Sequence, residues 1–322
     1  MRKVLGAAAL CCGIVFSASA QYGPPAPGSS VPPMTLGRLL LVDAARIGSR
    51  IVAVGDHGFV VLSDDEGATW RRARAPDAPL LTAVAFSDAT HGVAVGHDAL
   101  ILATEDGGET WKQVFSAPSE QRPLLTVAFA SPTHAIAAGA YGAYYDSTDG
   151  GRTWNARKIV EEDKHLNALL VLGPGQLLIL GEAGTILASR DDGSTWTSLA
   201  SPYKGSFFGG LVADDGAVVA YGLRGRIYRS SDHGATWAPV DNPSVAALMG
   251  GTRLPDGALV LAGAAGTALV SRDAGRSFQP IETRTPRLLA KAVLGAPNQV
   301  LLLGEAGPVP VTLPLHRPAR SP

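Results

Sequence analysis

The side chains that could carry out chemistry are few and scattered in this sequence. Ser201-Pro-Tyr-Lys204 has the Ser-x-x-Lys spacing in which a lysine can activate a serine for acyl transfer. No Ser-Asp-Asn or Lys-Thr-Gly partner motif follows it, so we interpret it as a solvated loop. The seven histidines show neither the i, i+4 spacing nor the cysteine partners of a zinc site. We therefore expect no metal, no other cofactor and no catalytic residue.

Acidic residues do recur at a fixed spacing, because the phrase Ser-x-Asp-x-Gly-x-Thr-Trp occurs six times with small variations, starting at residues 63, 104, 147, 189, 230 and 271. All five tryptophans of the chain occupy its last position. The acidic and aromatic positions are Asp65, Trp70, Asp106, Trp111, Asp149, Trp154, Asp191, Trp196, Asp232, Trp237, Asp273 and Phe278. We interpret all of them as structural, since one active site does not need six copies of itself.

Each part of the phrase has a role in a tight turn. The carboxylate of Asp106 can accept hydrogen bonds from backbone N–H groups of its own turn, and Gly108 can adopt a positive φ at low steric cost. Trp111 then opens a strand and can wedge its ring between neighbouring repeats. A calcium loop is the alternative, but the Asp-x-Asp-x-Asp-Gly ligand pattern is absent.

The elements around these turns are short strands. In the second repeat we expect strands at 80–86, 92–95, 100–103 and 111–114, called A to D. Four strands in about 41 residues make one blade of a β-propeller. An apolar run ending in glycine precedes each copy, and seven such glycines occur: Gly55, Gly96, Gly139, Gly181, Gly222, Gly263 and Gly304.

These repeats predict an all-β, seven-bladed β-propeller over residues 36–313. The seventh glycine turn has no following copy of the phrase, so the last blade should lack its own strand D. We expect residues 29–33, within the Pro-rich leader 21–35, to supply that strand and close the ring. Residues 314–322 are expected to form a C-terminal tail.

The first 20 residues have the features of a cleaved signal peptide. Arg2-Lys3 is followed by an apolar run, Val4 to Phe16, and by the small-x-small triplet Ala18-Ser19-Ala20. We expect a mature protein without a membrane span, exported to the periplasm or beyond the cell. Both cysteines lie inside this segment, and the full chain has 27 basic and 28 acidic residues. This balance argues against nucleic acid as a partner.

The repeated phrase is similar to the Asp-box, or bacterial neuraminidase repeat (BNR), of sialidases, sortilin-type receptors and some endoglucanases. The whole period resembles the photosystem II stability/assembly factor family over residues 36–313. The resemblance implies a seven-bladed propeller on the lumenal or periplasmic side of a membrane, with an assembly-type role. It also implies a basic patch for the membrane partner, whereas here only Arg224 makes a basic Gly-x-Arg-Gly turn.

Binding is expected on one face of the ring. The loops between blades and the turns between strands B and C share this face, and they vary most between repeats. The candidate partner-binding residues are Arg224, Tyr141, His57, His97, Arg122 and Lys204.

Two functions remain open from the sequence. The first is a non-enzymatic, protein-binding assembly or accessory factor for a membrane-associated or periplasmic complex. The second is a carbohydrate-active propeller, either a glycoside hydrolase or a lectin. The Arg-Ile-Pro signature of sialidases is absent. A pair of carboxylates facing each other across the channel would favour the second function.

Overall fold

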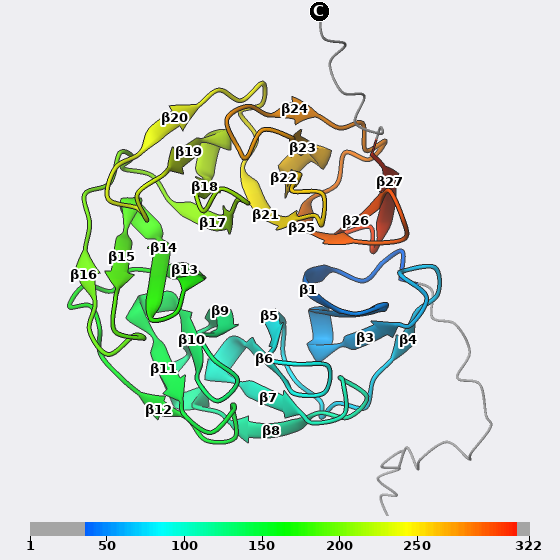
Figure 1. Cartoon of the computed structure of the whole chain (residues 1–322). Coiled ribbons are helices and arrows are strands. Elements are labelled where there is room, and N and C mark those ends of the chain that lie inside the picture. Colours follow the sequence, from blue (N-terminus) through cyan, green and yellow to red (C-terminus); the bar gives the residue numbers. More distant parts are fainter. Residues whose placement is uncertain (1–35, 314–322) are drawn as a thin grey trace, which may run out of the picture. The chain divides into compact units, whose positions relative to one another are not determined.

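The computed structural model describes residues 36–313, which form seven antiparallel sheets arranged as the blades of a propeller (Figure 1). Six sheets have four strands in sequence order, and the seventh, β25-β26-β27, has three. The seven-bladed β-propeller fold predicted from the repeats is confirmed. Strand A of each blade lies at the centre of the ring and strand D at its rim (Figure 1).

The strands of the first three blades are β1 (Leu41–Ile47), β2 (Arg50–Gly55), β3 (Val60–Ser63), β4 (Arg71–Arg72), β5 (Leu81–Phe86), β6 (Gly92–Gly96), β7 (Ile101–Thr104), β8 (Lys112–Phe115), β9 (Leu124–Phe129), β10 (Ala135–Gly139), β11 (Tyr144–Ser147) and β12 (Asn155–Ala156). Those of the fourth and fifth blades are β13 (Leu166–Gly173), β14 (Gln176–Gly181), β15 (Ile186–Ser189), β16 (Thr197–Ser198), β17 (Phe207–Val212), β18 (Val218–Gly222), β19 (Ile227–Ser230) and β20 (Ala238–Val240). The last two blades contain β21 (Leu248–Arg253), β22 (Leu259–Gly263), β23 (Ala268–Ser271), β24 (Gln279–Pro280), β25 (Leu289–Leu294), β26 (Gln299–Gly304) and β27 (Val309–Thr312).

The only helical pieces in residues 36–313 are single 3-10 turns, which the sequence had not predicted. Six of them form the B–C turns: η1 (Asp56–Gly58), η2 (His97–Ala99), η4 (Ala140–Gly142), η5 (Glu182–Gly184), η6 (Leu223–Gly225) and η7 (Ala264–Gly266). The remaining one, η3 (Pro118–Glu120), lies in the loop between the second and third blades. Within this described part, no helix has the length and apolar character needed to cross a membrane.

Three predicted segments lie outside the described residues: the signal peptide at 1–20, the leader at 21–35 with its closing strand, and the tail at 314–322. In the second blade, the predicted strands agree with β5 to β8 to within one residue at each end.

The repeated phrase forms the C–D turn of each of the first six blades. In the second blade, Asp106 accepts hydrogen bonds from the Thr104 hydroxyl (2.9 Å), the Thr110 N–H (2.9 Å) and the Thr110 hydroxyl (2.5 Å). The Thr104 hydroxyl, which is buried, also accepts the N–H of Gly108 at 3.0 Å. These bonds are all made inside the turn, which explains why the phrase recurs as a unit.

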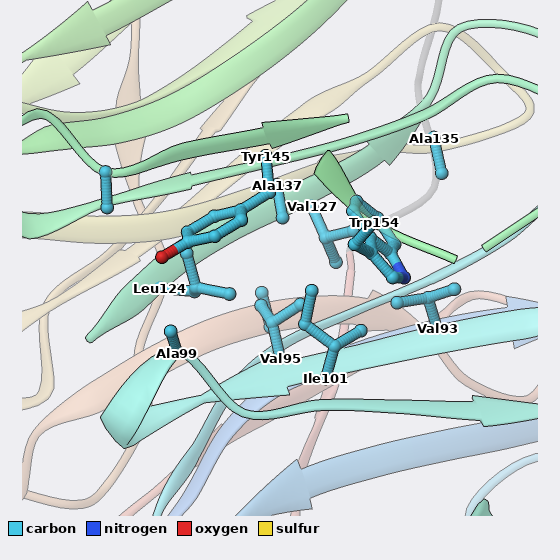
Figure 2. Close-up of a cluster of buried hydrophobic side chains, with 12 residues drawn as sticks. Val93, Val95, Ala99, Ile101, Leu124, Val127, Ala135, Ala137, Tyr145 and Trp154 are labelled. Carbon is cyan, nitrogen blue, oxygen red and sulfur yellow. The ribbon is translucent and has the colours of Figure 1, made fainter. Parts of the chain in front are cut away.

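The aromatic residue after each C–D turn packs into the gap between neighbouring blades. Trp154 of the third blade lies in a cluster that includes Val93, Val95 and Ile101 of the second blade (Figure 2). Its ring N–H donates to the carbonyl of Gly151 at 3.0 Å, so the polar edge of the ring is satisfied while its apolar area is buried. The core is therefore a series of inter-blade layers.

Arginines join the blades on the face that carries the C–D turns. Arg50 of the first blade donates to the Gly107 carbonyl (3.0 Å) and pairs with Glu109 (2.9 Å), both in the second blade. Arg157 and Arg229 similarly reach backbone carbonyls in the C–D turn of the following blade. This face is thus occupied by contacts that hold the ring together.

Candidate binding face

The opposite surface, called the binding face, consists of the B–C turns and the loops between blades. Each turn lies directly against a loop. A Cβ atom placed on Gly184 would lie 2.0 Å from the carbonyl oxygen of Tyr203, and one on Gly266 would lie 1.7 Å from that of Thr285. Both glycines also have positive φ, 75° and 69°. Only glycine allows this close approach, so turns and loops form one continuous surface.

Three of the six candidate residues occupy the same place in their turns. His57, Tyr141 and Arg224 are the middle residues of η1, η4 and η6, with φ of 53°, 54° and 59°. The left-handed conformation is costly for a residue with a Cβ. His97 lies one position earlier in η2, where Asp98 is the middle residue with φ of 59°. The side chains of His57, Tyr141 and Arg224 are all exposed, and that of Tyr141 is 50% exposed.

Tyr141 and Arg122 meet at a cavity of about 460 Å³ in the third blade. The cavity lies between two inter-blade loops, and its lining combines aromatic rings with charges of both signs. Tyr145, on β11, donates from its hydroxyl to Glu120 at 3.1 Å inside this lining. Burial, and then this hydrogen bond to a carboxylate, raise the pKa of Tyr145 to about 12. Tyr145 therefore acts here as a neutral hydrogen-bond donor.

Several lining groups are already paired with one another. Lys158 contacts Glu161 at 2.5 Å, and Arg157 is turned towards Asp146 at 2.9 Å. Asp163 also lines the cavity and has no ion pair or side-chain hydrogen bond in the described chain. The cavity thus offers an exposed tyrosine with charged groups around it. This arrangement suits a partner protein surface that has both polar and apolar groups.

The other candidates are distributed around the ring. His57 and His97 belong to the turns of the first and second blades, away from the cavity lining. Lys204 and Arg224 lie in neighbouring segments, because the Tyr203 hydroxyl donates to the carbonyl of Leu223 at 3.2 Å. The six candidates therefore do not form one site. Sequence reasoning missed Glu120 and the exposed Leu223 and Val245, and a search for large apolar residues in turns would have found Leu223.

A glycoside hydrolase would have two carboxylates facing each other across the central channel, which the innermost strands line. Among the seven innermost strands, Asp43 on β1 is the only acidic residue. Its Oδ1 contacts Nζ of Lys291 on β25 at 2.8 Å, and its Oδ2 accepts the N–H of Val84 at 2.9 Å. A carboxylate held in this way joins three blades. Within residues 36–313 no group of three metal-ligating side chains is arranged around a common point.

Comparison with known proteins agrees with this architecture. Residues 115–261 match the family model described as photosynthesis system II assembly factor YCF48. This confirms the resemblance to photosystem II assembly factors that the repeats predicted. No curated protein sequence matches the chain significantly.

Solved structures share the fold at low sequence identity. A structure of YCF48 bound to D1 peptide has a TM-score of 0.68 and 20% identity, covering 89% of this chain and 94% of that one. YCF48 from Cyanidioschyzon merolae has a TM-score of 0.68 and 18% identity, with coverages of 90% and 99%. The GH74 enzyme of Niastella koreensis has a TM-score of 0.65 and 16% identity, covering 87% of this chain but only 44% of its own.

Proposed function

We propose that this chain is an exported, non-enzymatic propeller that binds a protein segment as an assembly or accessory factor for a membrane-associated complex. The match to the assembly-factor family over residues 115–261 supports this role, and a structural relative is described as bound to a D1 peptide. The observation that carries the proposal is the cavity of the third blade, where Tyr141 and Arg122 meet on the binding face. The exported location rests on the signal-peptide features of residues 1–20.

The channel supports binding over glycoside hydrolysis. A hydrolase of the usual kind needs two carboxyl groups flanking the scissile bond. Asp43 is the only carboxylate on the innermost strands, and it forms an ion pair with Lys291. The likeness to the GH74 enzyme extends to the fold alone. We expect no turnover of sialosides or glucans by the purified protein, and hydrolysis above that of a heat-treated sample would contradict the proposal.

Site-specific cross-linking in the native host tests the binding role. A photo-reactive amino acid replaces Tyr141 in one strain and, as a matched control, Arg190 in another. Arg190 is also exposed but lies in a C–D turn, on the opposite face. We expect one protein of the membrane fraction to be cross-linked from position 141 and not from position 190. Arg122→Glu in the first strain should reduce that product. Identical products from both positions, or none from position 141, would reject the cavity as the binding site.

A further inference from the structure

The binding face carries an exposed apolar pair in its fifth blade. Leu223, the first residue of η6, is 38% exposed, and Val245, in the loop between β20 and β21, is 86% exposed. The equivalent positions of the other five 3-10 B–C turns hold polar or small residues: Asp56, His97, Ala140, Glu182 and Ala264. A large apolar side chain at this turn position is therefore particular to the fifth blade, and its exposure costs free energy unless something covers it.

The two segments that carry these apolar residues are held next to each other. Asn242 donates from its side-chain amide to the Gly225 carbonyl at 2.7 Å, which ties the loop of Val245 to the turn of Leu223. A Cβ on Gly225 would lie 2.3 Å from the Ser244 carbonyl oxygen, so no gap separates the two segments. On the other side, the Tyr203 hydroxyl bonds to the Leu223 carbonyl. A surface fixed in this way loses little conformational entropy when it binds.

Unpaired cations lie in the same turn as Leu223 and in the loop of Tyr203 beside it. Lys204, Arg224 and Arg226 are exposed, and none of them forms an ion pair or a side-chain hydrogen bond within residues 36–313. Asp241 is the acidic residue of the adjoining loop. By contrast, Arg50 and Arg229 on the opposite face are engaged by carboxylates and backbone carbonyls. The local charge is positive although the whole chain carries 27 basic and 28 acidic residues.

We propose that Tyr203, Lys204, Leu223, Arg224 and Val245, together called the blade-five strip, bind an acidic peptide segment of a partner protein that presents a large apolar side chain between its acids. Leu223 and Val245 cover the apolar side chain and remove it from water, while Lys204 and Arg224 pair with the flanking carboxylates. The proposal rests on the protein-binding role above, but it concerns a part of the binding face other than the cavity of Tyr141.

Fluorescence anisotropy with defined peptides tests the blade-five strip. The probe is an acetylated and amidated peptide in which Phe and Leu are flanked by four acidic residues. One comparison peptide has lysines in place of the acids, and another has alanines in place of Phe and Leu. We expect the intact chain to bind the probe more tightly than either comparison peptide, and more weakly as salt is added.

Two variants with the same change of charge separate the strip from general electrostatics. Lys204→Glu with Arg224→Glu should weaken binding of the probe by about tenfold or more, whereas Lys112→Glu with Arg190→Glu, placed on the rim and on the opposite face, should leave it within about twofold. Val245→Ser should also weaken binding of the probe without changing the melting temperature, because that side chain is 86% exposed. Failure of the intact chain to bind the probe, or equal affinities for both double variants, would overturn the proposal. Neither result would alter the cross-linking from position 141, which tests the protein-binding role separately.

Discussion

At the scale of single residues, the C–D turns depend on one carboxylate each. The aspartate of every turn accepts a backbone N–H and a hydroxyl from the residue four positions on, as Asp191 does from Thr195 at 2.9 and 2.6 Å. The serine or threonine two positions before the aspartate is buried, and its hydroxyl also hydrogen-bonds within the turn. These hydrogen bonds hold each carboxylate within its own turn, which is a structural role.

We expect Asp106→Ala to lower the free energy of unfolding by about 1 to 2 kcal/mol, because it leaves the donors of Thr104 and Thr110 without their acceptor. Chemical denaturation measures the change. Asp77→Ala is the control, since Asp77 is exposed and makes no side-chain hydrogen bond in the described structure. Equal stability of the two variants, or loss of partner binding without loss of stability in Asp106→Ala, would show that this turn is not structural.

The same carboxylates predict a dependence of stability on pH. Hydrogen bonds lower the pKa of Asp191 and of Asp232 from 3.8 to about 2, first those from the Thr195 and Thr236 hydroxyls and then those from the backbone N–H groups of the same two threonines. A pKa that is lower in the folded state stabilises the fold above the unfolded-state pKa, and this contribution is lost as the pH falls from about 4 to about 2. Thr195→Val with Thr236→Val should flatten the fall in melting temperature over that window. An unchanged slope would show that these hydroxyls do not set the acid response.

At the scale of elements, the B–C turns set the form of the binding face. In six blades the residue after the 3-10 turn donates its N–H back to the first turn residue, as Phe59 does to Asp56 at 3.1 Å. The seventh blade has Pro308 at this position, which has no N–H to donate. There the N–H of Gly307 closes the turn by donating to the Gly304 carbonyl. The pairing of β27 with β26 is shifted by one residue relative to the pairing of strands B and C in the other blades. The missing N–H of Pro308 thus coincides with a shifted register of the following strand.

The left-handed middle residues of these turns predict a stabilising substitution. Ala265 is exposed with φ of 53°, a conformation that costs alanine about 1 to 2 kcal/mol. Glycine avoids this cost but loses more entropy on folding, so Ala265→Gly should raise the free energy of unfolding by about 0.5 to 1 kcal/mol. In the exposed strand position 238, Ala238→Gly should be destabilising. Denaturation of both variants measures the difference, and destabilisation of both would contradict it.

At the scale of the whole molecule, the ring must close between its last and first blades. Asp43 and Lys291 join them at the channel, and Trp70 packs against Val293 and Leu301 of the seventh blade. Leu36 lies over the turn of that blade, since a Cβ on Gly307 would lie 2.4 Å from the Leu36 carbonyl oxygen. In the other blades, a loop between blades lies over the B–C turn in the way that Leu36 does here. A strand D precedes each of those loops.

This arrangement leads us to expect that residues before Leu36 supply the outer strand of the seventh blade. Deleting residues 21–34 should lower the melting temperature by several degrees and speed amide exchange in Val309–Thr312, because the outer edge of β27 would lose its partner. Deleting residues 314–322 is the control and should do neither. If the chain without residues 21–34 melts and exchanges like the intact one, closure does not involve the leader.

The amino-acid sequence alone determined the blades and their C–D turns. The number of blades, the four-strand repeat and the three-stranded last blade follow from a period of about 41 residues, and each turn is built from residues no more than four positions apart. Only the tertiary structure decided which loops meet. Tyr141 and Arg122 line one cavity, the loop of Val245 is tied to the turn of Leu223, and Asp43 pairs with Lys291 across most of the chain. Such contacts cross from one loop or blade to another, so they depend on how the blades pack around the ring, which no local spacing encodes.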